Sequence, residues 1–167
     1  MLAVNRMAYE PDLAQSGSFT SVGYLSGDRD YPQGETSDSV FDRLALLAML
    51  RLFSCMGHHD CDLGTCRSGL PQLESKWRGM TIPRYCSNEI LVPNRTWIYR
   101  APALILHYIR AHHYLPPVCF IDAVLACPEP GSDDYNSELR RIVPNVPFWQ
   151  LFEHRNSPTT RQGRSVV

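Results

Sequence analysis

Apolar residues recur with helical spacing along one stretch of this chain, VFDRLALLAMLRLF, which begins at Val40. Residues three and four positions apart share one face of a helix, so this spacing predicts an amphipathic helix from about Ser37 to Phe53. The members of the apolar stripe are Val40, Phe41, Leu44, Leu47 and Ala48. An N-cap is available at Thr36, Ser37 or Asp38, because each side chain offers an oxygen to the first backbone N–H groups. One face of this helix is therefore expected to be buried.

Strand patterns stand on either side of this helix. The runs EILVP and TWIYR flank the turn formers Pro93-Asn94-Arg95, and their β-branched and aromatic residues predict a hairpin. Pro93 is expected at a strand end, since it has no N–H to donate to a ladder. Phe19–Leu25 is a further predicted strand, and a short one is indicated near Met80–Ile82.

Later apolar segments predict three more helices. One opens at Ala101-Pro102, where proline suits the first turn because its missing N–H would have no helical partner there. It must end before Pro116-Pro117. The next is expected from Pro117 to Ala126, and a less apolar one over Asp133–Ile142.

These elements predict one α+β domain over residues 1–155, with a short antiparallel sheet packed against about three helices. Met7 offers a second start, so residues 1–6 are expected to be a dispensable extension. Residues 156–167 are polar and lack apolar periodicity, which predicts a disordered tail. The apolar segment at 145–154, NVPFWQLFEH, is interpreted as docked on the core, with a partner contact as the alternative.

Composition narrows the classes of partner and compartment. Sixteen basic and seventeen acidic residues give a formal charge of −1, so the chain has no cationic surplus for a nucleic acid. No apolar run approaches the roughly 20 residues of a membrane span, and the N-terminus lacks the apolar core of a signal peptide. A cytoplasmic protein is expected. In that compartment thiols stay reduced, so the six cysteines are not interpreted as three disulfides.

Two segments carry the candidate chemistry: HHDCDLGTC, from His58 to Cys66, and HYIRAHH, from His107 to His113. Cys61 and Cys66 are separated by four residues, and Gly64 between them can adopt the positive φ of a tight turn. His107 and His112 are also separated by four residues. Two thiolates and two imidazoles are the donors of a tetrahedral zinc site, so zinc is the predicted cofactor.

The exact ligand set stays open at this stage. Five positions advance about 500° around an ideal helix, which would leave the rings of His107 and His112 about 140° apart. The helix is therefore expected to tighten or fray near His112. His59, two residues before Cys61, is the first substitute for either helix histidine. The other four cysteines are interpreted as small apolar residues in the core.

A closed site with four protein ligands has no position for a reacting water and can only stabilise the fold. The predicted function is accordingly a non-enzymatic, zinc-stabilised binding or regulatory module with a protein partner. The alternative is a zinc-dependent hydrolase with an open three-ligand site, for which Asp60, Asp62 and Glu89 are the available bases. None of the three stands in an HExxH pattern, which favours the module.

Three motifs together resemble a family of short bacterial proteins of unknown function. They are a Gly-x-His-x-Cys segment at 57–61, an Asn-Glu-Ile-x-Val strand at 88–92, and His-Tyr-Ile-x-x-His-x-Tyr-x-Pro-Pro at 107–117. The likeness covers roughly residues 7–128. It implies that the histidines and cysteines belong to one site, and it supplies no activity. An extra imidazole at His58 and a longer gap between the two cysteines depart from the family pattern.

Overall fold

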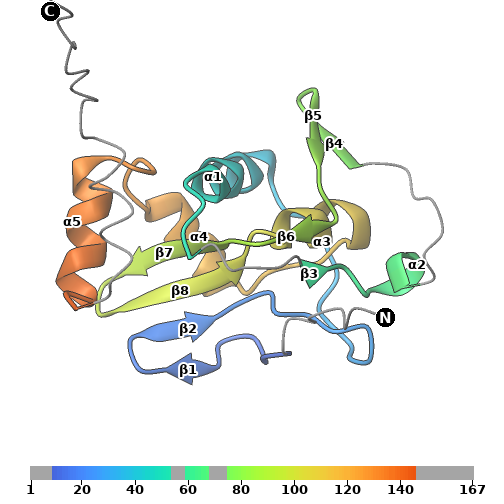
Figure 1. Ribbon diagram of the computed structural model, residues 1–167, viewed down its shortest axis with the longest axis horizontal. Coiled ribbons are helices and arrows are strands. Elements are labelled where there is room, and N and C mark those ends of the chain that lie inside the picture. Colours follow the sequence, from blue (N-terminus) through green and yellow to red (C-terminus); the bar gives the residue numbers. More distant parts are fainter. Residues whose placement is uncertain (1–8, 54–58, 68–74, 146–167) are drawn as a thin grey trace, which may run out of the picture.

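The computed structural model describes residues 9–53, 59–67 and 75–145. Its main sheet has four strands in the order β1-β2-β8-β7: Gln15–Ser16, Phe19–Ser21, Trp97–Pro102 and Glu89–Asn94 (Figure 1). Strand β2 runs parallel to β8, and the other two pairings are antiparallel. The α+β class is confirmed, and the sheet is mixed where an antiparallel one was expected.

The predicted hairpin is strands β7 and β8, which pair from Glu89 opposite Pro102 to Asn94 opposite Trp97. Pro93 is the penultimate residue of β7, close to the expected strand end. The helix expected to open at Ala101-Pro102 begins later, at Ile105. Ala101 is fully buried and pairs with Ile90, so the strand continues to Pro102, where a missing N–H is tolerated.

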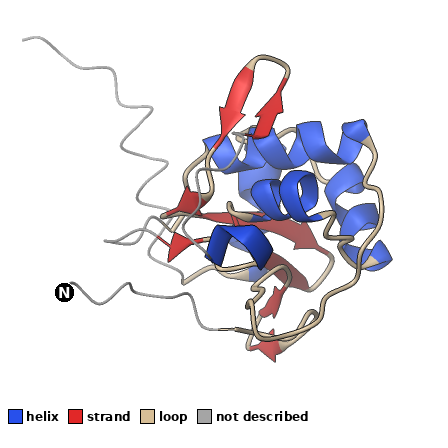
Figure 2. Cartoon of the chain, turned by 90° about the vertical axis from the view of Figure 1, so that its right-hand side faces the viewer, coloured by secondary structure: helices blue, strands red, loops and turns tan. Residues whose placement is uncertain are grey.

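Four helices cover one side of the main sheet, as Figures 1 and 2 both show. Helices α1, α4 and α5 pack against β7, and α3 packs against α1. Their bounds are Asp38–Met49 for α1, Ile105–His112 for α3, Val118–Ala126 for α4 and Asp133–Ile142 for α5. The last two confirm the predicted helices.

Helix α1 buries the predicted stripe at Val40, Phe41, Leu44 and Leu47. Ser37 is the N-cap residue, although its side chain makes no capping bond. The helix ends at Met49, four residues before the predicted end. Arg51 and Phe53 have positive φ, and Leu52 forms a bridge with Glu89, so the chain leaves the helix to join the sheet.

Two small ribbons and a short helix complete the described fold. Strand β3 (His59–Asp60) pairs with β6 (Tyr85–Cys86), and β4 (Ser75–Trp77) pairs with β5 (Met80–Ile82), which confirms the short strand expected there. Helix α2 spans Gly64–Arg67. The β4–β5 ribbon projects on the helix side of the sheet in both views. Within the described residues, no helix is long and apolar enough to cross a membrane.

The N-terminal segment ties the end of α3 to the sheet. The Tyr114 hydroxyl donates to Asp12 Oδ2 at 2.7 Å, and the backbone N–H of Gly23 donates to Asp12 Oδ1 at 2.8 Å. Tyr114 is fully buried. One carboxylate thus joins the residue that follows β2 to the residue that follows α3, which sets where that helix lies.

The calls for residues 1–6, for 156–167 and for nearly all of 145–154 fall outside the described residues. Cys86 and Cys127 are buried as expected. Cys119 is exposed, so its interpretation as a core residue was wrong. It lies on the side of α4 that faces away from Phe120 and Val124, which fill the core.

Candidate metal centre

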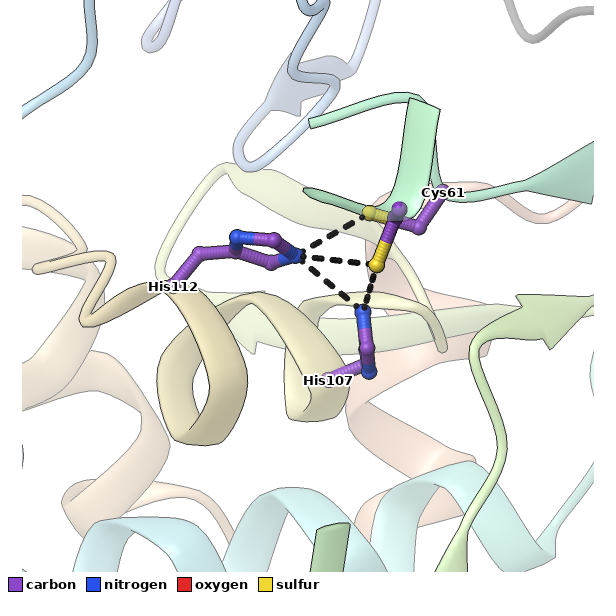
Figure 3. Close-up of side chains that lie close together, drawn as sticks. Cys61, His107 and His112 are labelled. Atoms are coloured by element: carbon purple, nitrogen blue, oxygen red, sulfur yellow. Dashed lines mark hydrogen bonds between the residues drawn. The ribbon is translucent and has the colours of Figure 1, made fainter. Parts of the chain in front are cut away.

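Four side chains from two distant segments meet at one point. The donor atoms of Cys61, Cys66, His107 and His112 all lie within 4.8 Å of one another, close enough to bind a single metal ion. Figure 3 shows His107 and His112 projecting from α3 toward Cys61 on the loop above it. Cys61, Cys66 and His107 are buried, and His112 is half-buried. The cluster therefore borders solvent only at His112.

Hydrogen bonds alone cannot account for the distances at His112. Its Nε2 lies 3.3 Å from Cys61 Sγ, 3.4 Å from Cys66 Sγ and 3.2 Å from His107 Nε2 (Figure 3). A neutral imidazole nitrogen carries at most one proton, which can serve one of these three neighbours. A cation between the four atoms would contact all of them at once. Cys66 Sγ is also 3.3 Å from His107 Nε2, which closes the cluster.

The loop that carries the cysteines is held at both ends. The N–H of Cys61 donates to the carbonyl of Arg84 at 2.9 Å, next to the β3–β6 pairing. Gly64 has φ +46°, as predicted, and the N–H of Cys66 then donates to the carbonyl of Leu63. The backbone N–H of Leu63 points at Cys61 Sγ, 3.4 Å away. Such a bond favours the thiolate that a metal requires.

The last turn of α3 explains how two histidines five positions apart share a face. The N–H groups of His113 and Tyr114 both donate to the carbonyl of Tyr108, five and six residues earlier. A regular α-helix bonds to the fourth residue back, so this turn is wider and holds more residues. The expectation of tightening or fraying was wrong, because the helix stays intact to His112 and widens. The two ring centroids are 5.0 Å apart.

Burial sets the protonation of these groups. Burial lowers the pKa of His107 to about 4, with a smaller contribution from neighbouring His112. Burial also lowers the pKa of His112. Both rings are therefore neutral at pH 7, the form that binds a metal. Burial raises the pKa of Cys61, with Cys66 adding to the effect, so a bound cation must displace its thiol proton.

The structure places His59 outside this cluster. It lies on β3 and pairs with Cys86 on β6, and the group of close donors found among the described residues does not contain it. The alternation of side chains along a strand explains this, since a residue two positions before Cys61 continues the ribbon while Cys61 turns inward. His113 is exposed with φ +53°, and His58 falls outside the described residues.

Comparison with known proteins bears on the whole site. A family model described as Domain of unknown function (DUF7919) matches residues 3–125. The chain belongs to this family. No curated protein and no solved structure matches the chain. The matched region of DUF7919 includes all four clustered residues, whereas α5 lies beyond it. The expected likeness to an uncharacterised family is confirmed at that level.

One part of the site in this DUF7919 chain was not foreseen from the sequence. Gly27, which follows β2, packs against the cysteine loop, and its N–H donates to Asp62 Oδ1 at 3.1 Å. A Cβ at this position would lie 2.3 Å from the Asp62 carbonyl oxygen. Next to it, Asp28 forms an exposed ion pair with Arg67. The only hint in the sequence was the Ser-Gly-Asp turn directly after a predicted strand.

We expect Gly27→Ala to weaken both folding and metal binding, because the Asp62 backbone must move to admit the methyl group. Overpacking of this kind typically costs about 1–3 kcal/mol of unfolding free energy. Urea denaturation with and without a chelator would measure it. Asp28→Ala is the matched control: it removes only an exposed ion pair and should change stability by less than about 1 kcal/mol. Equal effects of the two variants would contradict the steric explanation.

Proposed function

We propose that this protein is a non-enzymatic binding or regulatory module whose fold is stabilised by one zinc ion held by Cys61, Cys66, His107 and His112. The observation that carries the proposal is the convergence of these four donor atoms within 4.8 Å. We place the module in the cytoplasm, where reducing conditions keep both thiols available as ligands. Its partner is proposed to be a protein, since a net charge of −1 gives nucleic acid little attraction.

The donor set favours zinc over other common ions. Two sulfurs and two imidazole nitrogens in a tetrahedron suit zinc, whereas calcium and magnesium take oxygen ligands. Metal–sulfur bonds of about 2.3 Å and metal–nitrogen bonds of about 2.0–2.1 Å set the edges of such a tetrahedron. They place two nitrogens about 3.3–3.4 Å apart and nitrogen and sulfur about 3.5–3.6 Å apart. The distances of 3.2 Å between nitrogens and 3.3–3.4 Å between nitrogen and sulfur are close to these values.

A structural role follows from the number of donors. Four protein ligands fill a tetrahedron and leave no position for the water that a hydrolase would activate. The proposed ion instead joins the cysteine loop to α3. These segments are 40 residues apart in the sequence between Cys66 and His107, so one ion would constrain a long section of chain.

We expect purified protein to carry close to one equivalent of zinc, measured by inductively coupled plasma mass spectrometry. Cobalt exchanged into the site should give the absorption bands of a closed tetrahedral thiolate site, and these should not change when azide is added. Azide-sensitive bands would instead indicate an open position and favour the hydrolase. Absence of metal, together with folding that a chelator leaves unchanged, would contradict the proposal.

A further inference from the structure

A groove lies beside the metal cluster, between α1 and the segment from β5 to β6. Its volume is about 600 Å³, within the range of about 300–1,000 Å³ typical of ligand-binding cavities. One wall is a face of α1, with Phe41, Ala45 and Met49. The other wall is the continuous stretch from Met80 to Asn88, apart from Arg84. We call this cavity the α1 groove.

Large apolar side chains are exposed on the rim of this groove. Met49 is 66% exposed, Met80 is 51% exposed, and Tyr85 is 48% exposed. These are also the two methionines in the part of the chain that the structure describes. Methionine is flexible and polarizable, and it is frequent on surfaces that adapt to apolar partners. Leaving both in water is unfavourable unless something covers them.

The face of α1 in the groove suits a second helix. Ala45 and Ala48 lie three positions apart on this face, between the larger Phe41 and Met49. Small side chains let another helix approach closely, and the larger neighbours provide ridges for its side chains to pack between. An amphipathic helix uses apolar residues at three- and four-residue spacing to occupy such a groove.

The charge around the groove indicates the sign of the partner. Arg51 lies in the lining, while Arg78 and Arg110 stack on Trp77 at the other end. Arg78 pairs with Asp42, and Arg110 pairs with Asp38. Three guanidinium groups therefore face two carboxylates here, a local positive excess on a chain whose net charge is −1. Acidic residues beside the apolar face of a partner would complement this excess.

We propose that the α1 groove docks an amphipathic helix of a partner protein, with its apolar face against α1 and acidic residues toward Arg51. This inference rests on the proposed function and names its binding surface. The partner is distinguished by chemistry: apolar side chains at helical spacing, flanked by glutamate or aspartate.

The metal cluster supports the same groove from behind. Tyr85 and Cys86 line the groove and form β6, which pairs with β3 directly before Cys61. Leu106 also lines it and precedes His107. Loss of the ion would release the cysteine loop from α3 and loosen the wall that β6 forms. Docking is therefore expected to depend on zinc.

The test uses the full zinc-loaded chain and three synthetic peptides of about 16 residues. The first has leucines at helical spacing with glutamates beside them, the second replaces each glutamate by lysine, and the third scrambles the leucine positions. Isothermal titration calorimetry measures binding. The acidic peptide should bind at least about tenfold more tightly than either of the others.

Two variants with matched exposure locate the site. Met80→Glu places a carboxylate on the groove rim and should weaken binding of the acidic peptide by about tenfold or more. Leu125→Glu is the control, because Leu125 is 48% exposed on α4, away from the groove. It should leave affinity within about twofold of the unmodified chain. Circular dichroism checks that both variants fold.

Several results would overturn the inference. These are equal binding of the three peptides, or an unchanged affinity in Met80→Glu. Self-association in light scattering that Met80→Glu abolishes would assign the groove to a second copy of the chain instead. Failure of the proposed function is read separately, from the zinc content of the same sample. Binding that survives complete removal of zinc would refute the coupling while leaving the docking site intact.

Discussion

Cys61→Ser is expected to lower the melting temperature by about 10–15 °C and to reduce the zinc content to near zero. In isolated zinc-finger peptides the ion contributes about 10–16 kcal/mol of apparent binding free energy. This domain has a core of its own, so we expect a smaller loss, roughly 4 kcal/mol. For a chain of this size each kcal/mol shifts the melting temperature by about 2–4 °C. Differential scanning calorimetry with metal analysis on the same sample measures both quantities.

The control is Cys119→Ser, which removes a thiol that is exposed on α4 and remote from the cluster. Its melting temperature and zinc content should match those of the unmodified chain. His107→Ala should behave like Cys61→Ser, because it removes a buried ligand from the other half of the site. A melting temperature that falls equally in all three variants would show that the effect is not specific to metal.

Tyr135→Ala is expected to reduce the free energy of unfolding by about 3–5 kcal/mol, comparable with the loss of the metal. Tyr135 lies on α5 and is fully buried, and its hydroxyl donates to the backbone carbonyl of Leu91 at 2.7 Å. Truncation leaves a cavity against the central hairpin and an unpaired carbonyl. Urea denaturation followed by circular dichroism would measure the change.

Tyr135→Phe separates the two contributions, since it keeps the ring and removes only the hydroxyl. It should destabilise the protein by about 1–2 kcal/mol. The comparison has a wider meaning because α5 lies outside the part of the chain that the DUF7919 model matches. If both substitutions are neutral, α5 is an appendage; if both destabilise as expected, it belongs to the same folding unit.

Residue type and spacing were sufficient to predict the four clustered side chains. Soft donors in two short segments have few reasons to occur together other than a metal, and Gly64 marked the turn between the cysteines. His59 could not be separated from the others by the same logic. Only the pairing of β3 with β6 shows that the ribbon directs it elsewhere. Spacing along a chain does not state which face a residue will take.

Features that depend on distant contacts were missed. Nothing near Phe19 predicts that it pairs with Ile98 in a parallel register. The end of β8 was assigned to a helix because Ala101 and Pro102 suit both, and burial against Ile90 decided between them. The widened turn at His112 arises from two bonds to one carbonyl, a detail of capping that no residue there specifies.

The α1 groove also escaped the sequence pattern. Period and polarity assigned Phe41 to the core, which is correct, and left Met49 unremarkable at the helix end. The missing information was that the β4–β5 ribbon projects beside α1 and does not cover it. An exposed methionine in a chain with few of them was the one available signal.

The tie between Asp12 and Tyr114 has a consequence for how this protein is made. A ribosome releases the first strands long before the segment that must receive them. Until residue 114 emerges, β2 lacks its parallel neighbour and the cysteines lack both imidazoles. Assembly of the sheet and assembly of the metal cluster thus await the same stretch of nascent chain, so a translation product that stops short of it would possess neither.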